Sequence, residues 1–85
     1  MFGGDSVQRE PVTIDQAAQR LDRLPRTVRT WASRYHARLL VKIGTASYYD
    51  WLDLATIGRQ LHLGEHVPAT PEERDALRES LKTAA

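Results

Sequence analysis

A proline at position 25 divides the first half of this 85-residue chain into two short segments with helical apolar spacing. Proline moves the preceding residue out of the helical conformation and itself fits the first turn of a new helix. The apolar residues at intervals of three and four are Ile14, Ala17, Ala18 and Leu21 before it, and Val28, Trp31, Ala32 and Tyr35 after it. Two short helices joined by about four residues predict a unit of the helix-turn-helix type.

Capping patterns predict where the helices begin and end. Thr13, followed three residues later by Gln16, is typical of a capping box and predicts the start of the first helix. Asp50 is expected to cap a third helix, which carries apolar residues at helical spacing and stops near Gly64. Those apolar residues are Leu54, Ile57 and Leu61.

The segment between the second and third helices changes to the pattern of strands. Leu40, Val41 and Ile43 precede a short turn sequence, and Tyr48 and Tyr49 follow it. This pattern predicts a two-stranded hairpin with its tip at 44–47, and alternation places one tyrosine inward and the other outward. A lone hairpin is marginal in water, so it is expected to pack on the helices.

The expected organisation is mainly α-helical with a small two-stranded antiparallel β wing, followed by a C-terminal helix. Residues 1–11 are expected to be disordered, 12–64 to form a winged helix-turn-helix domain, 65–70 to be a linker, and 71–85 to be the last helix. A capping box between Thr70 and Glu73 marks the start of that helix. Two alternatives remain open: the helix folds back onto its own domain, or it uses Leu77 and Leu81 to contact a second copy or another protein.

Charge is distributed unevenly along the chain, although the formal net charge is only +1. Residues 20–42 contain seven basic side chains and one acidic side chain, whereas residues 1–19 and 50–85 are net acidic. Such a basic middle predicts a surface that faces a polyanion. The basic and small polar residues of the second helix lie outside its apolar stripe, which is also compatible with an ordinary solvated face. Trp31 and Tyr35 could stack on single-stranded bases, but their spacing with Val28 favours core packing.

No feature of the sequence favours an enzyme. The chain contains no cysteine, which excludes disulfides and thiolate ligands and fits a reducing compartment. The segment from His62 to His66 matches an inverted zinc-protease motif, but Gly64 interrupts it and no third ligand is evident. We therefore expect no catalytic residue, no cofactor and no metal site, and no apolar run reaches the ~20 residues of a membrane span.

The string AAQRLDRLPRTVRTWASRY, followed by KIGTASYYDWLDLATI, resembles the winged helix-turn-helix of the MerR-like and excisionase-like superfamily. The resemblance covers about residues 12–62, although the turn LDRLP lacks the glycine common in that superfamily. It implies that the helix from Pro25 enters the major groove and that the wing contacts the backbone or minor groove. The residues expected to contact DNA are Arg23, Arg26, Thr27, Arg29, Thr30, Ser33, Arg34, Lys42, Thr45 and Ser47.

The resemblance favours a phage or integrative-element excisionase, a recombination directionality factor that binds and bends attachment-site DNA with integrase. No long coiled-coil helix follows the domain, which argues against an effector-sensing regulator. The alternatives are a small transcriptional regulator, the DNA-recognition part of a phage packaging system (a terminase small subunit), or an adaptor whose basic face binds an acidic protein. The expected partners are double-stranded DNA, integrase and a second copy of the chain, in the cytoplasm of a bacterial host.

Overall fold

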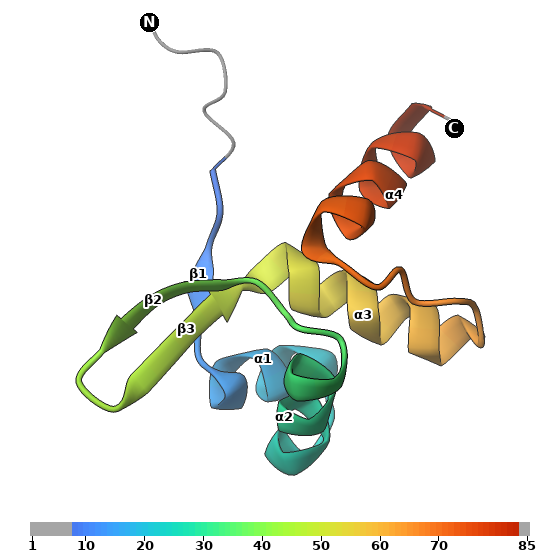
Figure 1. The fold of residues 1–85 in the computed structure, drawn as a ribbon. Coiled ribbons are helices and arrows are strands. Elements are labelled where there is room, and N and C mark those ends of the chain that lie inside the picture. Colours follow the sequence, from blue (N-terminus) through green and yellow to red (C-terminus); the bar gives the residue numbers. More distant parts are fainter. Residues whose placement is uncertain (1–7, 84–85) are drawn as a thin grey trace, which may run out of the picture.

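The structure is a computed structural model that describes residues 8–83 (Figure 1). Four helices and a three-stranded antiparallel sheet make up this part of the chain. The elements are β1 (Pro11–Val12), α1 (Ile14–Leu21), α2 (Pro25–Arg34), β2 (Leu39–Ile43), β3 (Ala46–Asp50), α3 (Trp51–Leu63) and α4 (Pro71–Thr83). The mainly helical architecture with a small antiparallel sheet is therefore confirmed.

The expected capping residues set the boundaries of α1. The Thr13 hydroxyl accepts a hydrogen bond from the Gln16 backbone N–H at 3.1 Å, and the Gln16 side chain accepts one from the Thr13 N–H at 2.9 Å. The helix ends at Asp22, which adopts a left-handed conformation with φ of 57°. Aspartate tolerates this conformation better than most residues. The turn between α1 and α2 therefore closes without a glycine.

The apolar stripes of α1, α2 and α3 meet in one core. Its fully buried members include Val28 of α2 and Leu54 and Ile57 of α3, while Trp31 and Tyr35 are partly buried against them. At Gly58 of α3 a Cβ atom would lie 3.2 Å from the Trp31 ring, so the absence of a side chain lets the two helices approach closely. Core packing of Trp31 and Tyr35 is confirmed.

The sheet has a third strand that the sequence pattern did not predict. Strand β1 pairs antiparallel with β3, opposite Tyr49 and Asp50, and the strand order is β1-β3-β2. The expected two-stranded wing is therefore wrong by one strand. Disorder over residues 1–11 is wrong for 8–11, because Arg9 pairs with Asp50 at 2.9 Å and Pro11 begins the strand; residues 1–7 lie outside the described part. A two-residue strand is too short to show an alternating apolar pattern, so only its pairing with β3 identifies β1 as a strand.

The hairpin turn is shorter than the expected tip at 44–47. Ile43 pairs with Ala46, so Gly44 and Thr45 alone connect the strands, and Ser47 belongs to β3. Gly44 has a φ of +61°, a conformation that glycine adopts at little cost. Tyr49 packs against the core, as the predicted alternation requires of one of the two tyrosines.

The segment expected to be a linker is packed against the domain. Val67 is a buried member of the core, and the Gln60 side-chain amide donates to the His66 carbonyl at 2.9 Å. The segment therefore does not let α4 reach away. In Figure 1 the connecting segment turns back along α3, and α4 begins beside this helix, which is its neighbour in the fold.

A buried arginine attaches α4 to its own domain. Arg74 and Asp53 are both fully buried, and the arginine donates from Nε and Nη2 to the two carboxylate oxygens of Asp53 at 2.5 and 2.9 Å. Arg74 also donates to the Pro68 carbonyl at 2.8 Å. The structure thus selects docking on the same chain. Leu77 is partly buried and Leu81 is 39% exposed, and self-association through this pair stays a prediction.

A second set of ion pairs surrounds Asp75 of α4. Its carboxylate accepts from Arg38 at 3.0 Å and from Arg9 at 3.3 Å, and it also pairs with Arg78. Burial pushes the pKa of Asp75 up, but the hydrogen bonds from Arg38 and Arg9 outweigh it, so the pKa lies below its ordinary value of 3.8.

This lowered pKa makes the stability sensitive to acid. A group whose pKa falls on folding stabilises the folded state above its unfolded pKa, and that contribution is lost as the pH falls through the folded pKa. Asp75→Asn is therefore expected to lower the melting temperature at pH 7 and to flatten its decline below about pH 4. Thermal melts between pH 7 and pH 2 check this, with the exposed Asp15→Asn as control. Parallel declines in Asp75→Asn and the wild type would contradict the assignment.

Candidate nucleic-acid interface

The outer face of α2 gathers five of the residues expected to contact DNA. They are Arg26, Arg29, Thr30, Ser33 and Arg34, which together line one shallow hollow on the surface. All five are exposed. The apolar stripe of the same helix faces the core, so the 3.6-residue period turns these side chains outward together. Pro25 in the first turn fixes the start of the helix, which has no side-chain cap, and therefore the position of this face.

Not every basic residue of the middle segment is available to a ligand. Arg20 pairs with Glu10 through hydrogen bonds of 2.5 and 3.0 Å and lies 4.8 Å from the Trp51 ring centroid. Arg38 donates to Asp50 and Asp75, and this pairing raises its pKa. The acidic ends of the chain thus neutralise these two arginines. Such pairing joins residues far apart in sequence, so charge counting along the chain could not reveal it.

Five cations of the segment have no acidic partner in the part of the chain that the structure describes. Within residues 8–83, no carboxylate lies within ion-pair distance of Arg23, Arg26, Arg29, Arg34 or Lys42. Guanidinium and ammonium groups are hydrogen-bond donors only, so this set suits an anion with many acceptor oxygens.

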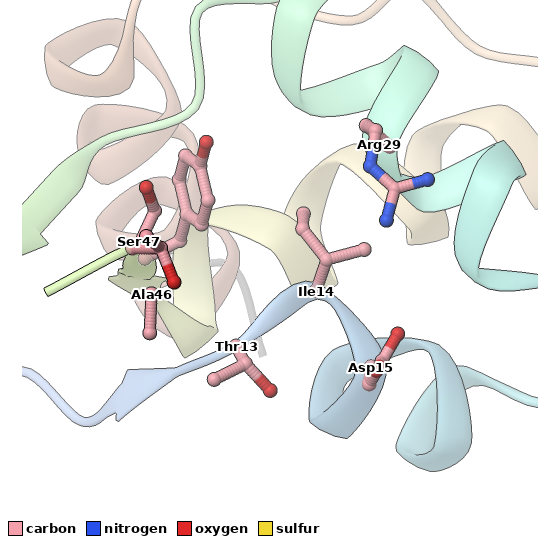
Figure 2. Close-up of a pocket in the computed structure, with 8 residues that line it drawn as sticks. Thr13, Ile14, Asp15, Arg29, Ala46 and Ser47 are labelled. Carbon is pink, nitrogen blue, oxygen red and sulfur yellow. The ribbon is translucent and has the colours of Figure 1, made fainter. Parts of the chain in front are cut away.

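Arg29 connects the helix face to the hairpin. It also lines a second pocket, which lies between α2, the start of α1 and the hairpin tip (Figure 2). Thr45 and Ser47 contribute to the same pocket from the hairpin side. Figure 2 shows the Arg29 guanidinium extending from α2 toward Ile14 at the start of α1. Arg29 is therefore shared by the hollow on the α2 face and the pocket beside the hairpin tip, which adjoin each other at this side chain.

Strand register places Lys42 on the same side of the hairpin. Lys42 is the cross-strand partner of Ser47, and directly opposed residues project to the same face of a sheet. The pocket beside Arg29 also contains Asp15, whose carboxylate disfavours a phosphate at that corner. The sequence pattern did not mark Asp15 as part of this surface. Its position in the first turn of α1 is the normal place for an acidic residue and gave no sign of this second effect.

Three of the residues predicted to contact DNA are less suited to do so, because they lie apart from the α2 face, are partly buried, or use their hydrogen-bond donor within the protein. Arg23 lines a different pocket with Trp31, Arg59 and His62, so it is separated from the α2 face. Thr27 is partly buried. The Thr30 hydroxyl donates to the Arg26 carbonyl at 3.0 Å, which leaves only its acceptor capacity for a ligand. The surface is thus centred on Arg26, Arg29 and Arg34 and on the hairpin.

The other chemistry that the sequence raised has no support in the geometry. Gly64 ends α3 in a left-handed conformation, so His62 and His66 do not share a continuous helix. No cluster of three potential metal ligands occurs among residues 8–83. Over that same range, none of the helices combines the length and the apolar character that crossing a membrane requires.

Comparisons with protein-family models, curated proteins and solved structures gave no match to this chain.

Proposed function

We propose that the chain is a sequence-specific double-stranded DNA-binding protein that does no covalent chemistry. One observation carries this proposal: Arg26, Arg29 and Arg34 are exposed on one helix face and have no acidic partner among residues 8–83, and this face adjoins the hairpin that bears Lys42 and Thr45. A helix fits the width of the major groove, and arginines with small hydroxyl residues are suited to base edges and phosphates.

The two parts of this surface suit different tasks in the proposed complex. Arg26 and Arg29 lie in the first half of α2, where a recognition helix approaches the bases. Lys42, Thr45 and Ser47 lie on the hairpin to one side and would contact the backbone. This division supports a helix-turn-helix protein with a small basic wing, in keeping with the resemblance to the excisionase-like superfamily.

Among DNA-binding roles we favour an excisionase that assists integrase, with a small transcriptional regulator and a packaging component as alternatives. The resemblance to the excisionase-like superfamily supports this choice. A bending assay tests it: an accessory recombination factor is expected to bend its site, and to change the ratio of excision to integration in a reaction with purified integrase. Binding without either effect would favour a regulator.

The dependence of binding on salt separates DNA binding from an adaptor function. Each phosphate contact contributes about −0.9 to the slope of log K against log salt concentration. Two phosphate contacts, from Arg34 and Lys42, therefore predict a slope of about −2 on duplex DNA. An adaptor that recognises an acidic protein would show no comparable affinity for the duplex.

Two variants are expected to affect DNA binding in different ways. Arg29→Ala should weaken specific binding by about 1–3 kcal/mol and relax the preference at one base pair, because a bidentate base contact is lost. Lys42→Ala should weaken binding to all sequences alike and reduce the salt slope by about one unit. Competition titrations against scrambled duplexes measure both effects.

Matched controls carry the same loss of charge elsewhere. Arg59→Ala and Lys82→Ala each remove an exposed cation outside the proposed surface and should change specific affinity little. If Arg59→Ala reduced affinity and specificity as much as Arg29→Ala, the α2 face would not be the reading surface.

A further inference from the structure

Two cations that have no acidic partner lie outside the proposed DNA surface. Of the twelve arginines and lysines of the chain, six form ion pairs within residues 8–83. These are Arg9, Arg20, Arg38, Arg74, Arg78 and Lys82. Four of the other six lie on the α2 face and the hairpin. The remaining two, Arg23 and Arg59, line one pocket together with Trp31 and His62, which we call the Trp31 pocket.

The floor of the Trp31 pocket is apolar. The Trp31 ring and the Leu21 side chain converge on Gly58 of α3, where a Cβ atom would lie 3.2 Å from the ring and 3.6 Å from Leu21. Ala55, which precedes Gly58 on α3, also lines the pocket. Trp31 and Leu21 are only partly buried, so part of each faces solvent. The pocket has a volume of about 450 Å³, which lies within the usual range of ligand sites.

The Trp31 pocket lies on the flank of α2 that faces away from the hairpin. At 3.6 residues per turn, Arg29 and Trp31 are two positions apart and project to nearly opposite sides of the helix. Arg29 lines the pocket beside the hairpin, whereas Trp31 packs toward α3. DNA centred on Arg29 and the hairpin would therefore approach from the other side of α2. A phosphate group also offers nothing apolar that could cover the Trp31 ring.

We propose that the Trp31 pocket binds an acidic amphipathic segment of a partner protein, with an apolar side chain on the floor and carboxylates at the rim. Arg59 and His62 lie one turn apart on α3, whereas Arg23 follows α1, so polar groups reach the floor from two elements. The Arg59 guanidinium donates to the Gln60 side chain at 2.5 Å. That of Arg23 donates to the Asp22 carbonyl at 3.3 Å. Each guanidinium keeps further N–H groups that can donate to a carboxylate.

Asp22 also lines the Trp31 pocket and provides a test of opposite sign. Its carboxylate repels an acidic ligand, so Asp22→Asn should tighten binding at least twofold. Asparagine tolerates the left-handed conformation that Asp22 adopts, so the substitution preserves the turn. Binding at this pocket requires no DNA, and its failure would leave the proposed DNA-binding function unaffected.

Fluorescence anisotropy of the full chain with a labelled peptide tests the proposal. The probe is a synthetic peptide of about 12 residues that carries leucine and phenylalanine at helical spacing among aspartates and glutamates. The wild type should bind it with a dissociation constant on the order of 10–100 µM. Arg59→Glu should weaken binding at least tenfold, because a carboxylate then opposes the peptide. Lys82→Glu is the matched control, since it makes the same change of charge on α4, and it should alter binding less than twofold.

Two further measurements separate the Trp31 pocket from general attraction between charges. A peptide of equal charge with serine in place of leucine and phenylalanine should bind at least tenfold more weakly, because it leaves the floor uncovered. Ala55→Gln extends a neutral side chain over the floor and should weaken binding of the first peptide at least fivefold. A melting temperature close to that of the wild type shows that this variant is folded.

Several outcomes would overturn the proposal. They are no binding by the wild type up to about 1 mM peptide, equal affinity for the serine peptide, or equal effects of Arg59→Glu and Lys82→Glu. Loss of peptide binding in Arg26→Glu but not in Arg59→Glu would place the peptide on the α2 face instead. If Arg59→Ala reduced affinity for duplex DNA as much as Lys42→Ala, the cations of the Trp31 pocket would belong to the DNA surface.

Discussion

Replacing Asp53 with alanine is expected to destabilise the domain by about 3–5 kcal/mol, because the Arg74 guanidinium would remain buried without its counter-ion. Both side chains are fully buried, and Asp53 also accepts a hydrogen bond from the Arg38 backbone N–H at 2.8 Å. A domain of this size has a total stability of only about 5–10 kcal/mol. Thermal or urea unfolding should therefore show a drop on the order of 20 °C in melting temperature or a largely unfolded variant.

Two further variants test the role of the buried ion pair even if Asp53→Ala does not fold. The double variant Asp53→Leu with Arg74→Met removes both charges and should recover much of the lost stability, since apolar replacement of a buried ion pair is often nearly neutral. Lys82→Ala breaks an exposed ion pair with Glu79 and should melt close to the wild type. If the unfolding free energy of Asp53→Ala lay within about 1 kcal/mol of the wild-type value, α4 would not be docked through Arg74 in solution.

Replacing Trp31 with alanine is expected to cost about 3 kcal/mol, at the lower end of large aromatic truncations because the ring is only partly buried. The ring packs over Gly58 and lines a pocket with Leu21. Its loss leaves a cavity that Gly58, which has no side chain, cannot fill. Urea denaturation measures the change in unfolding free energy.

The same variant distinguishes a core role for Trp31 from a role in contacting bases. At a temperature where Trp31→Ala is folded, its affinity for duplex DNA should remain within a few-fold of the wild type. Leu24→Ala is the control for an exposed apolar residue near the same turn, and it should affect neither property. A Trp31→Ala protein that unfolds normally but no longer binds DNA would make Trp31 a contact residue.

The sequence alone determined the ends of most helices and the residues that face the core. Thr13, Pro25, Asp50, Gly64 and Thr70 act on backbone groups within about four residues, and each sits at the helix end where it was expected. Helical periodicity likewise assigned Val28 and Ile57 to the core. For the same reason it placed the arginines of α2 together on the outside, which was most of what could be said about the candidate site.

Only the tertiary structure decided which charges are free and which elements meet. Arg74 belongs to a stripe of basic residues on α4, a pattern typical of a solvent-exposed helix face. It is nevertheless buried against Asp53, 21 positions earlier in the chain. Arg38 forms an ion pair with Asp75, 37 positions away, so its charge is not free for a ligand. Strand β1 forms only because β3 lies beside it. The position of Arg29 between α2 and the hairpin also depends on how the sheet packs on the helices. Contacts between residues so far apart in the sequence depend on how the whole domain packs, whereas helix caps and helical periodicity depend on the nearest few residues.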